Sequence, residues 1–265
     1  LEPSADNSLP AELQAQAKLT RTRLGDVYIA FPSPQELQHS QAFWDVVALD
    51  PGVRTFQTGF CSNGVVIEWG ANDMTGVFRR LRNADKLQSR IANEKDKSRR
   101  RRMRHAWLRM LLKIRRRIDH LHKCLCAFLV RAFKVILLPE FESQRMSSRT
   151  TRKIGNRTVR SMLTWGHYRF RELLKAKVLT VIGCTLVICD EHYTSKTCGS
   201  CGQLHHKLGA SKTFHCPHCG YTADRDANGA RNILLRFIAI HNIAFTLPSR
   251  PTATTTTTTT TTTRR

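Results

Sequence analysis

The sequence lacks long hydrophobic runs. The longest apolar stretch without a charged residue extends from Val178 to Cys189, and a helix needs about 20 apolar residues to cross a bilayer. A secretion signal is also missing, and the chain begins at Leu1 rather than Met. We therefore expect neither a membrane-spanning nor a secreted protein, and we interpret the chain as a fragment or a processed gene product.

Acidic residues are scarce. The 265 residues include 43 Lys and Arg against 20 Asp and Glu, which gives a formal charge of +23 and a pI near 10.4. A surface this basic repels itself unless it meets a polyanion, which favours nucleic acid or an anionic membrane as the partner. Hydrophobic residues make up 41% of the chain, so a folded core is expected.

Glycine and proline are absent between Gly76 and Phe133, and the pattern from Met74 to Phe133 predicts one long helix. Residues 79–117 contain 17 Lys or Arg against three acids. Such a run usually forms a solvated helix face, but the acids that would pair with it are missing, which favours contact with phosphates. The candidate phosphate contacts are Arg99, Arg100, Arg101, Arg102, Arg104, Arg115, Arg116 and Arg117.

Apolar runs separated by turn residues predict strands on both sides of this helix. Three consecutive antiparallel strands are expected before it, and the second and third of them should form a hairpin. A strand buried on both faces should follow it, then a helix, another strand and a last helix. The expected ranges are Val27–Phe31, Val46–Leu49, Thr55–Phe60, Val65–Trp69, Lys134–Leu138, Thr158–Lys177, Leu186–Cys189 and Ala227–His241. The order predicts a mixed α/β fold with acids at strand ends, where such sheets build sites.

Four of the nine cysteines form two CxxC pairs, Cys198 with Cys201 and Cys216 with Cys219, separated by fourteen residues. Two such knuckles can close a thiolate tetrahedron around zinc, and a closed site of this kind is structural. A redox pair would need one CxxC at a helix start rather than two matched copies. Disulfides are disfavoured because the odd number of cysteines and the missing secretion signal favour a reducing compartment.

Three acids stand where the predicted elements end or begin. Asp50 ends the first strand of the predicted sheet, Glu140 follows the buried strand, and Asp226 precedes the last helix. Taken singly, Asp50 fits a turn and Asp226 fits a helix N-cap. Taken together, they match the three or four carboxylates that two Mg²⁺ ions need for hydrolysis of a phosphodiester.

The cysteine region carries a resemblance to a known family. Thr194-Ser-Lys-Thr-Cys198-Gly-Ser-Cys201, Cys216-Pro-His-Cys219-Gly and Asp224-Arg-Asp226-Ala-Asn228-Gly-Ala-Arg-Asn232-Ile closely resemble the C-terminal part of TnpB proteins. These are transposon-encoded RNA-guided nucleases related to compact type V CRISPR effectors, and their eukaryotic and viral relatives are called Fanzor. Asp50-Pro-Gly-Val-Arg-Thr-Phe resembles the first RuvC motif of the family, and Leu138-Pro-Glu140-Phe resembles the second.

The resemblance implies an RNase H-like RuvC nuclease fold with an inserted four-cysteine zinc ribbon. It also implies an RNA-guided DNA endonuclease in which Asp50, Glu140 and Asp226 bind two catalytic Mg²⁺ ions, with guide RNA and target DNA as partners. Some family members use a displaced acid before the TSKTC motif, where Glu191 stands here, so Glu140 and Glu191 both remain eligible. Trp165, Tyr168 and Phe170 resemble the family's helix before the ribbon; packing on the sheet is favoured for them over stacking on bases.

The predicted organisation has five parts. Residues 1–43 are a linker or the remnant of an N-terminal domain, 44–193 the nuclease core, 194–222 the ribbon, 223–242 the last nuclease segment, and 243–265 a disordered threonine-rich tail. Few residues precede the core, so the family's recognition lobe is expected to be absent or reduced. The rival hypothesis is a catalytically silent nucleic-acid-binding remnant. We expect a nuclear location in a eukaryotic host and a cytoplasmic one otherwise.

Overall fold

The computed structural model describes residues 16–32, 34–141, 146–148, 154–190, 193–206, 208–209 and 211–241. Glu191 and the threonine-rich segment 243–265 lie outside the described residues, so the expectations for them stay predictions. In the described part, no helix is long and apolar enough to span a bilayer.

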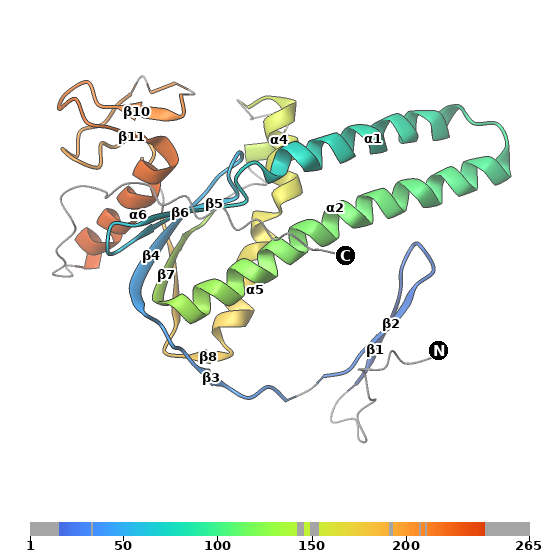
Figure 1. The fold of residues 1–265 in the computed structure, drawn as a ribbon, viewed down its shortest axis with the longest axis horizontal. Helices are drawn as coiled ribbons and strands as arrows, with labels where there is room; N and C mark the ends of the chain where they lie inside the picture. The colour runs from blue at the N-terminus through green and yellow to red at the C-terminus, as the bar shows by residue number, and fades with distance from the viewer. Residues whose placement is uncertain are drawn as a thin grey trace.

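A five-stranded sheet in the order β6-β5-β4-β7-β9 forms the centre of the molecule (Figure 1). Its first three strands in sequence are antiparallel neighbours, as predicted, whereas β7 and β9 run parallel to β4. The strands are β4 (Trp44–Pro51), β5 (Gln57–Cys61), β6 (Val66–Trp69), β7 (Phe133–Pro139) and β9 (Thr185–Cys189). The apolar run of β7 therefore occupies an inner position between two parallel neighbours, which explains its burial.

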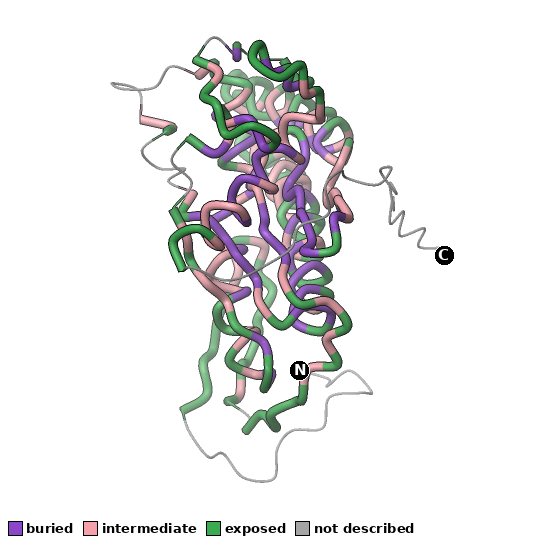
Figure 2. Tube along the Cα trace, turned by 90° about the vertical axis from the view of Figure 1, so that its left-hand side faces the viewer, coloured by how far each residue is buried: buried purple, intermediate pink, exposed green. Residues whose placement is uncertain are grey.

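Alternate residues of the sheet serve two separate cores, because successive side chains of a strand point to opposite faces. Val47 and Leu49 of β4 pack into the larger core with the long helices. Ala48, which lies between them, packs with Leu137 and Ile233 on the opposite face. The buried residues follow the central strands and the parts of the helices that pack on them (Figure 2).

The prediction of one long helix from Met74 to Phe133 was wrong. The segment forms two antiparallel helices, α1 (Asp73–Asn93) and α2 (Lys97–Ala132), which extend together beyond the sheet (Figure 1). The chain turns where Glu94 adopts extended backbone, and Asp96 then caps α2 by accepting hydrogen bonds from the backbone of Ser98 and Arg99. The expected single helix is divided because Asp96 caps a new helix N-terminus within the continuous helical pattern. We call this pair of helices the helical arm.

Shorter helices complete both faces of the sheet. The single helix expected at Thr158–Lys177 is divided at Gly166 into α4 (Asn156–Trp165) and α5 (His167–Val178). The arm helices and α5 cover one face, and α6 (Arg225–His241) covers the other. Trp165 and Phe170 are fully buried, as the packing interpretation predicted, whereas Tyr168 is exposed.

Among the described residues, three small two-stranded sheets lie outside the central one. A hairpin of β1 (Lys18–Arg21) and β2 (Val27–Ala30) matches the strand expected near Val27, and all residues of its two strands are exposed. The parallel pair is β3 (Gln38–His39) with β8 (Val181–Ile182), and the hairpin of the cysteine region is β10 (Thr213–His215) with β11 (Thr222–Asp224). The second hairpin leads directly into α6 and so connects the cysteine region to the sheet.

Candidate metal centres and nucleic-acid surface

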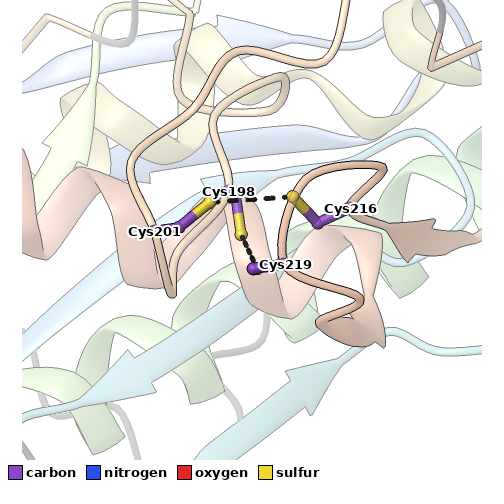
Figure 3. Close-up of side chains that lie close together, drawn as sticks. All are labelled: Cys198, Cys201, Cys216 and Cys219. Carbon is purple, nitrogen blue, oxygen red and sulfur yellow. Dashed lines mark hydrogen bonds between the residues drawn. The ribbon is translucent and has the colours of Figure 1, made fainter.

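The four predicted cysteine ligands meet at one point (Figure 3). Their sulfur atoms all lie within 4.8 Å of one another, and the Cys198–Cys219 and Cys201–Cys216 pairs are each 3.7 Å apart. A zinc ion with Zn–S bonds of about 2.3 Å requires about 3.8 Å between the sulfurs of a tetrahedron. The donor set therefore fits a four-thiolate zinc site.

The backbone around the cysteines forms two tight turns, and in the second turn N–H groups point at a sulfur. The glycine after each second cysteine, Gly202 and Gly220, has a φ of +75° and +72°, a region that side chains other than glycine rarely adopt. Backbone N–H groups of the second knuckle, first that of Cys219, point at Cys216 and lower its pKa to about 6. The backbone of the second knuckle thus favours the thiolate of Cys216, the form that binds zinc, whereas burial raises the pKa of Cys198 in the first knuckle to about 12.

Two of the predicted acids stand at the same edge of the sheet. Asp50 is near the carboxyl end of β4, and Glu140 follows the carboxyl end of the neighbouring parallel strand β7. The register that pairs Ala48 with Leu137 brings these two ends side by side. The structure therefore brings together two acids that are ninety residues apart in sequence.

Asp226 approaches this edge from α6. It lies in the first turn of the helix, three residues before Gly229, and residues three apart are neighbours on a helix surface. A Cβ built on Gly229 would stand 2.6 Å from Oδ2 of Asp50. The Asp50 carboxylate thus lies directly against α6, one turn from Asp226.

The surroundings of Asp226 raise the pKa of its carboxyl. Burial is the main cause, and the negative charge of Asp224 adds to it, while Lys212, Arg225 and Arg54 act in the opposite direction. The N-cap role considered for Asp226 belongs to Asp224, whose Oδ1 accepts hydrogen bonds from the backbone N–H groups of Asp226 and Ala227. Burial of an acid beside a second acid is an arrangement that a divalent cation relieves.

Glu140 differs from the other two acids because its side chain is largely exposed. Its carboxylate lies 3.7 Å from the guanidinium of Arg171 on α5. Among the described His, Cys, Asp and Glu residues, the four cysteines form the only group of three or more whose ligand atoms lie within 4.8 Å of one another. The three acids therefore share an edge without converging on one point. Their oxygen ligands fit Mg²⁺, which takes one or two carboxylates and keeps several waters.

The eight candidate arginines lie on α2, and seven of them are exposed, Arg100 being half-buried. In the part of the chain that the structure describes, three form ion pairs with acids: Arg99 with Glu94, Arg115 with Asp119, and Arg117 with Asp73. Arg101 and Arg102 line an open hollow of the arm. This hollow is formed by Ser98, Arg101, Arg102, His105 and Arg109. The hollow gathers basic side chains along one helix face, which suits an anionic backbone.

Sequence reasoning missed Gly229, Asn228 and Asn232 as parts of the site. Gly229 makes room for Asp50, because a Cβ at that position would stand 2.6 Å from Oδ2 of the carboxylate. The two asparagines are polar, yet both are buried on the face of α6 where apolar residues would be expected. Polar residues four apart beside apolar ones were a usable signal, because a buried amide needs partners.

Comparison with known proteins finds a matching family model and several relatives of similar description. Residues 167–233 match the family model described as Cas12f1-like, TNB domain. The chain is 37% identical over 226 residues to the putative transposase A625R of Paramecium bursaria Chlorella virus 1, which covers 85% of this chain and 50% of that protein. It is 27% identical to the TnpB-like protein L79 of Acanthamoeba polyphaga mimivirus, over 70% of this chain and 36% of the relative.

A bacterial relative and a solved structure complete the comparison. The chain is 30% identical to the putative RNA-guided DNA endonuclease InsQ of Escherichia coli (strain K12), over 79% of this chain and 54% of the relative. A structure titled as a Cas12f1-sgRNA-target DNA complex matches with a TM-score of 0.45 and 19% identity, over 71% of this chain and 48% of that one. This chain thus spans about half the length of the first relatives or less. The sequence matches confirm its resemblance to the TnpB family and its RNA-guided endonuclease relatives.

Proposed function

We propose that this chain is the nuclease part of a TnpB- or Fanzor-like RNA-guided DNA endonuclease with a RuvC fold and a structural zinc ribbon. The observation that carries the proposal is the position of the Asp50 carboxylate against Gly229, one turn of α6 from Asp226. The order of the sheet supports the RuvC assignment, since antiparallel strands lead into a parallel pair with acids at the strand ends.

In this proposal Asp50, Asp226 and either Glu140 or Glu191 hold two Mg²⁺ ions. When bound, the ions supply Lewis-acid stabilisation for the attacking and leaving oxygens of a phosphodiester. The chain itself supplies the frame: β4 and β7 fix two acids at one edge, and α6 brings the third. Arg54, whose charge acts on Asp226, is placed to attract the phosphate that the reaction needs.

Guide RNA and target DNA are the proposed partners, held along their backbones by the basic face of α2. Replacement of Arg101 and Arg102 tests this surface, because both side chains line its hollow. Each phosphate contact that is removed should reduce the slope of log affinity against log salt by about 0.9. We expect Arg101→Gln with Arg102→Gln to reduce it by about 1.8, and an unchanged slope would contradict the assignment.

The proposed activity is tested by cleavage of labelled single- and double-stranded DNA in Mg²⁺. The chain is co-expressed with the non-coding RNA that flanks its gene, beside Asp226→Asn and Asp50→Asn variants. We expect cleavage by the wild type, a loss of at least about a hundredfold in either variant, and unchanged nucleic-acid binding. Cleavage that survives in the variants would remove these acids from the site, and binding without cleavage in the wild type would favour the silent remnant.

A pair of matched variants separates the two candidates for the remaining acid. Glu140→Gln and Glu191→Gln each remove one charge without changing side-chain size. Because only one of the two completes the proposed ligand set, one variant should lose cleavage and the other should keep it. The proposed nuclear or cytoplasmic location follows the host and is tested by imaging a fluorescent fusion.

A further inference from the structure

Two asparagine side chains of α6 fasten the first cysteine knuckle to the helix. Oδ1 of Asn228 accepts a hydrogen bond of 2.9 Å from the backbone N–H of Gly199, and its Nδ2 donates to the Thr197 carbonyl at 2.8 Å. Nδ2 of Asn232 donates to the carbonyls of Thr197 and Thr194 at 2.7 and 2.8 Å. We call Asn228 and Asn232 the asparagine clamp.

The clamp is buried and tightly fitted. Asn228 is 1% exposed and Asn232 is 5% exposed, so neither amide can exchange its partners for water without opening the contact. A Cβ on Gly199 would stand 2.8 Å from Oδ1 of Asn228, which shows how closely the knuckle backbone approaches the helix. The knuckle and α6 must therefore keep one relative position.

The same two turns of α6 hold the acid site. Gly229 follows Asn228 directly and accommodates the Asp50 carboxylate, and Asp226 lies two residues before the clamp begins. Cys198, the first zinc ligand, lies between Thr197 and Gly199, the two residues that Asn228 holds. One buried set of hydrogen bonds thus joins the first cysteine knuckle to the helix that carries Asp226 and lies against Asp50.

We propose that the asparagine clamp couples the two metal centres, so that zinc at the four cysteines strengthens divalent-cation binding at Asp50 and Asp226. Zinc fixes the knuckle, the clamp passes that order to α6, and α6 holds Asp226 at its distance from Asp50. Asn228 and Asn232 act as positioning residues, because they touch neither metal. This inference rests on the proposed function for its acid site.

Coupling of this kind is reciprocal, since two ligands that favour the same arrangement strengthen each other by the same factor. A cation at the acids should therefore slow the loss of zinc. A general loss of stability would not link these two quantities, whereas coupling makes the cation affinity of the acids and the rate of zinc loss change together. It should vanish when the clamp is removed even in a protein that remains folded.

Mn²⁺ serves as the probe, because it accepts oxygen ligands as Mg²⁺ does and is detected by electron paramagnetic resonance. Its affinity is measured on zinc-loaded protein and after treatment with a zinc-selective chelator. The variants are Asn228→Ala with Asn232→Ala, and Asn83→Ala as the control, an exposed asparagine on α1. We expect zinc removal to weaken Mn²⁺ binding at least about fivefold in the wild type and the control, and less than twofold in the clamp variant.

A second measurement follows the rate of zinc release with and without Mn²⁺. Mn²⁺ should slow release in the wild type and the control but not in the clamp variant. If the double variant fails to hold zinc, Asn232→Asp replaces it, since that change keeps the side-chain size and removes both of the donated hydrogen bonds. Circular dichroism checks that each variant is folded.

The possible results distinguish the two proposals. Equal Mn²⁺ affinity with and without zinc in the wild type would overturn the coupling and leave the acid site standing. Full coupling in the clamp variant would overturn the role of the asparagines. A zinc-loaded wild type that binds no Mn²⁺ would overturn the proposed acid site and the coupling together.

Discussion

The ribbon and the base of the helical arm keep their shapes by different means. In the ribbon, the described buried core consists of Cys198, Leu208, Phe214 and Cys216, two of which are proposed zinc ligands. The base of α2 instead buries Ile114, Ile118, Leu125 and Leu129 in the larger core. The contrast predicts that the ribbon depends on a bound ion, whereas the arm depends on the apolar area that it removes from water.

Breaking the zinc site should give the largest effect. We expect Cys216→Ser to remove the zinc, because three thiolates leave the tetrahedron open, and structural zinc contributes on the order of 10 kcal/mol to small zinc domains. Metal analysis should fall from one zinc per chain to none, and hydrogen exchange should accelerate in the ribbon while the sheet stays protected. Cys124→Ser, which changes an exposed cysteine of α2, should keep its zinc. A zinc-loaded Cys216→Ser protein would contradict the ligand set.

The second prediction concerns the apolar packing at the base of the arm, where a truncated side chain would leave a cavity. Leu129 is fully buried in the larger core, so Leu129→Ala should lower the free energy of unfolding by about 2–5 kcal/mol. Urea denaturation measures this loss, and the zinc content should not change. Leu163→Ala provides the control, since Leu163 is 56% exposed and its truncation should cost little. Equal losses in both variants would contradict the burial of Leu129 in the larger core.

Acid should weaken the base of the arm through two buried histidines. Burial lowers the pKa of His167 to about 3 and that of His122 to about 4, and both rings stack on Phe56. The unfolded chain binds these protons near pH 6.5, so stability is complete above that pH and falls as the pH decreases toward 4. Each histidine should contribute a slope of about 1.4 kcal/mol per pH unit.

Replacement of one histidine sharpens this test. His167→Phe keeps an aromatic ring against Phe56 but cannot bind a proton, so it should remove about half of the loss between pH 6 and pH 4. Urea denaturation at several pH values measures the slope in the variant and in the wild type. An identical pH dependence in both proteins would show that His167 is not held neutral by the core.

The smallest expected effect concerns the turn between the arm helices. Asp96→Ala removes the side chain that caps α2, which leaves the backbone N–H groups of Ser98 and Arg99 without this acceptor and weakens the start of the helix. Hydrogen exchange in the first turn of α2 should accelerate, while the base of the arm should not respond. Asp96→Asn, which keeps an oxygen acceptor, should restore most of the protection. Protection that Asn does not restore would mean that the charge of Asp96 matters more than its hydrogen bonds.

The sequence was most informative where one local pattern dominated. The continuous apolar run of β7 and the two CxxC pairs predicted a buried strand and a four-cysteine cluster, because those patterns have few other physical solutions. The division of the helix was missed although Asp96 precedes Ser98 in a capping pattern, since no glycine or proline accompanied it. Periodicity alone does not distinguish one long helix from two that pack against each other.

The finer arrangement of the site required contacts between distant segments. Asp50 and Gly229 are far apart in sequence, so nothing local shows that the absent Cβ of Gly229 leaves room for a carboxylate. The same holds for Asn228, whose partners lie in the knuckle some thirty residues earlier. Glu140 was located at its strand end, but its contact with Arg171 depends on how α5 packs. Sequence patterns predicted which elements carry the acids, and tertiary packing determined how close they come.

The unequal lengths of the arm helices have a consequence for insertions and deletions. With 36 residues against 21, α2 exceeds α1 by about 22 Å at 1.5 Å per residue. The chain leaves the sheet at the carboxyl end of the edge strand β6 and returns at the amino end of β7, because Trp69 is level with Pro51 of β4 whereas Phe133 pairs with Trp44. The excess of α2 carries the chain back along the length of the strands and across to β7. Matched insertions of whole turns at the tip of both helices should therefore lengthen the arm and leave the sheet unchanged, whereas an insertion in α2 alone would shift the register of β7 against β4.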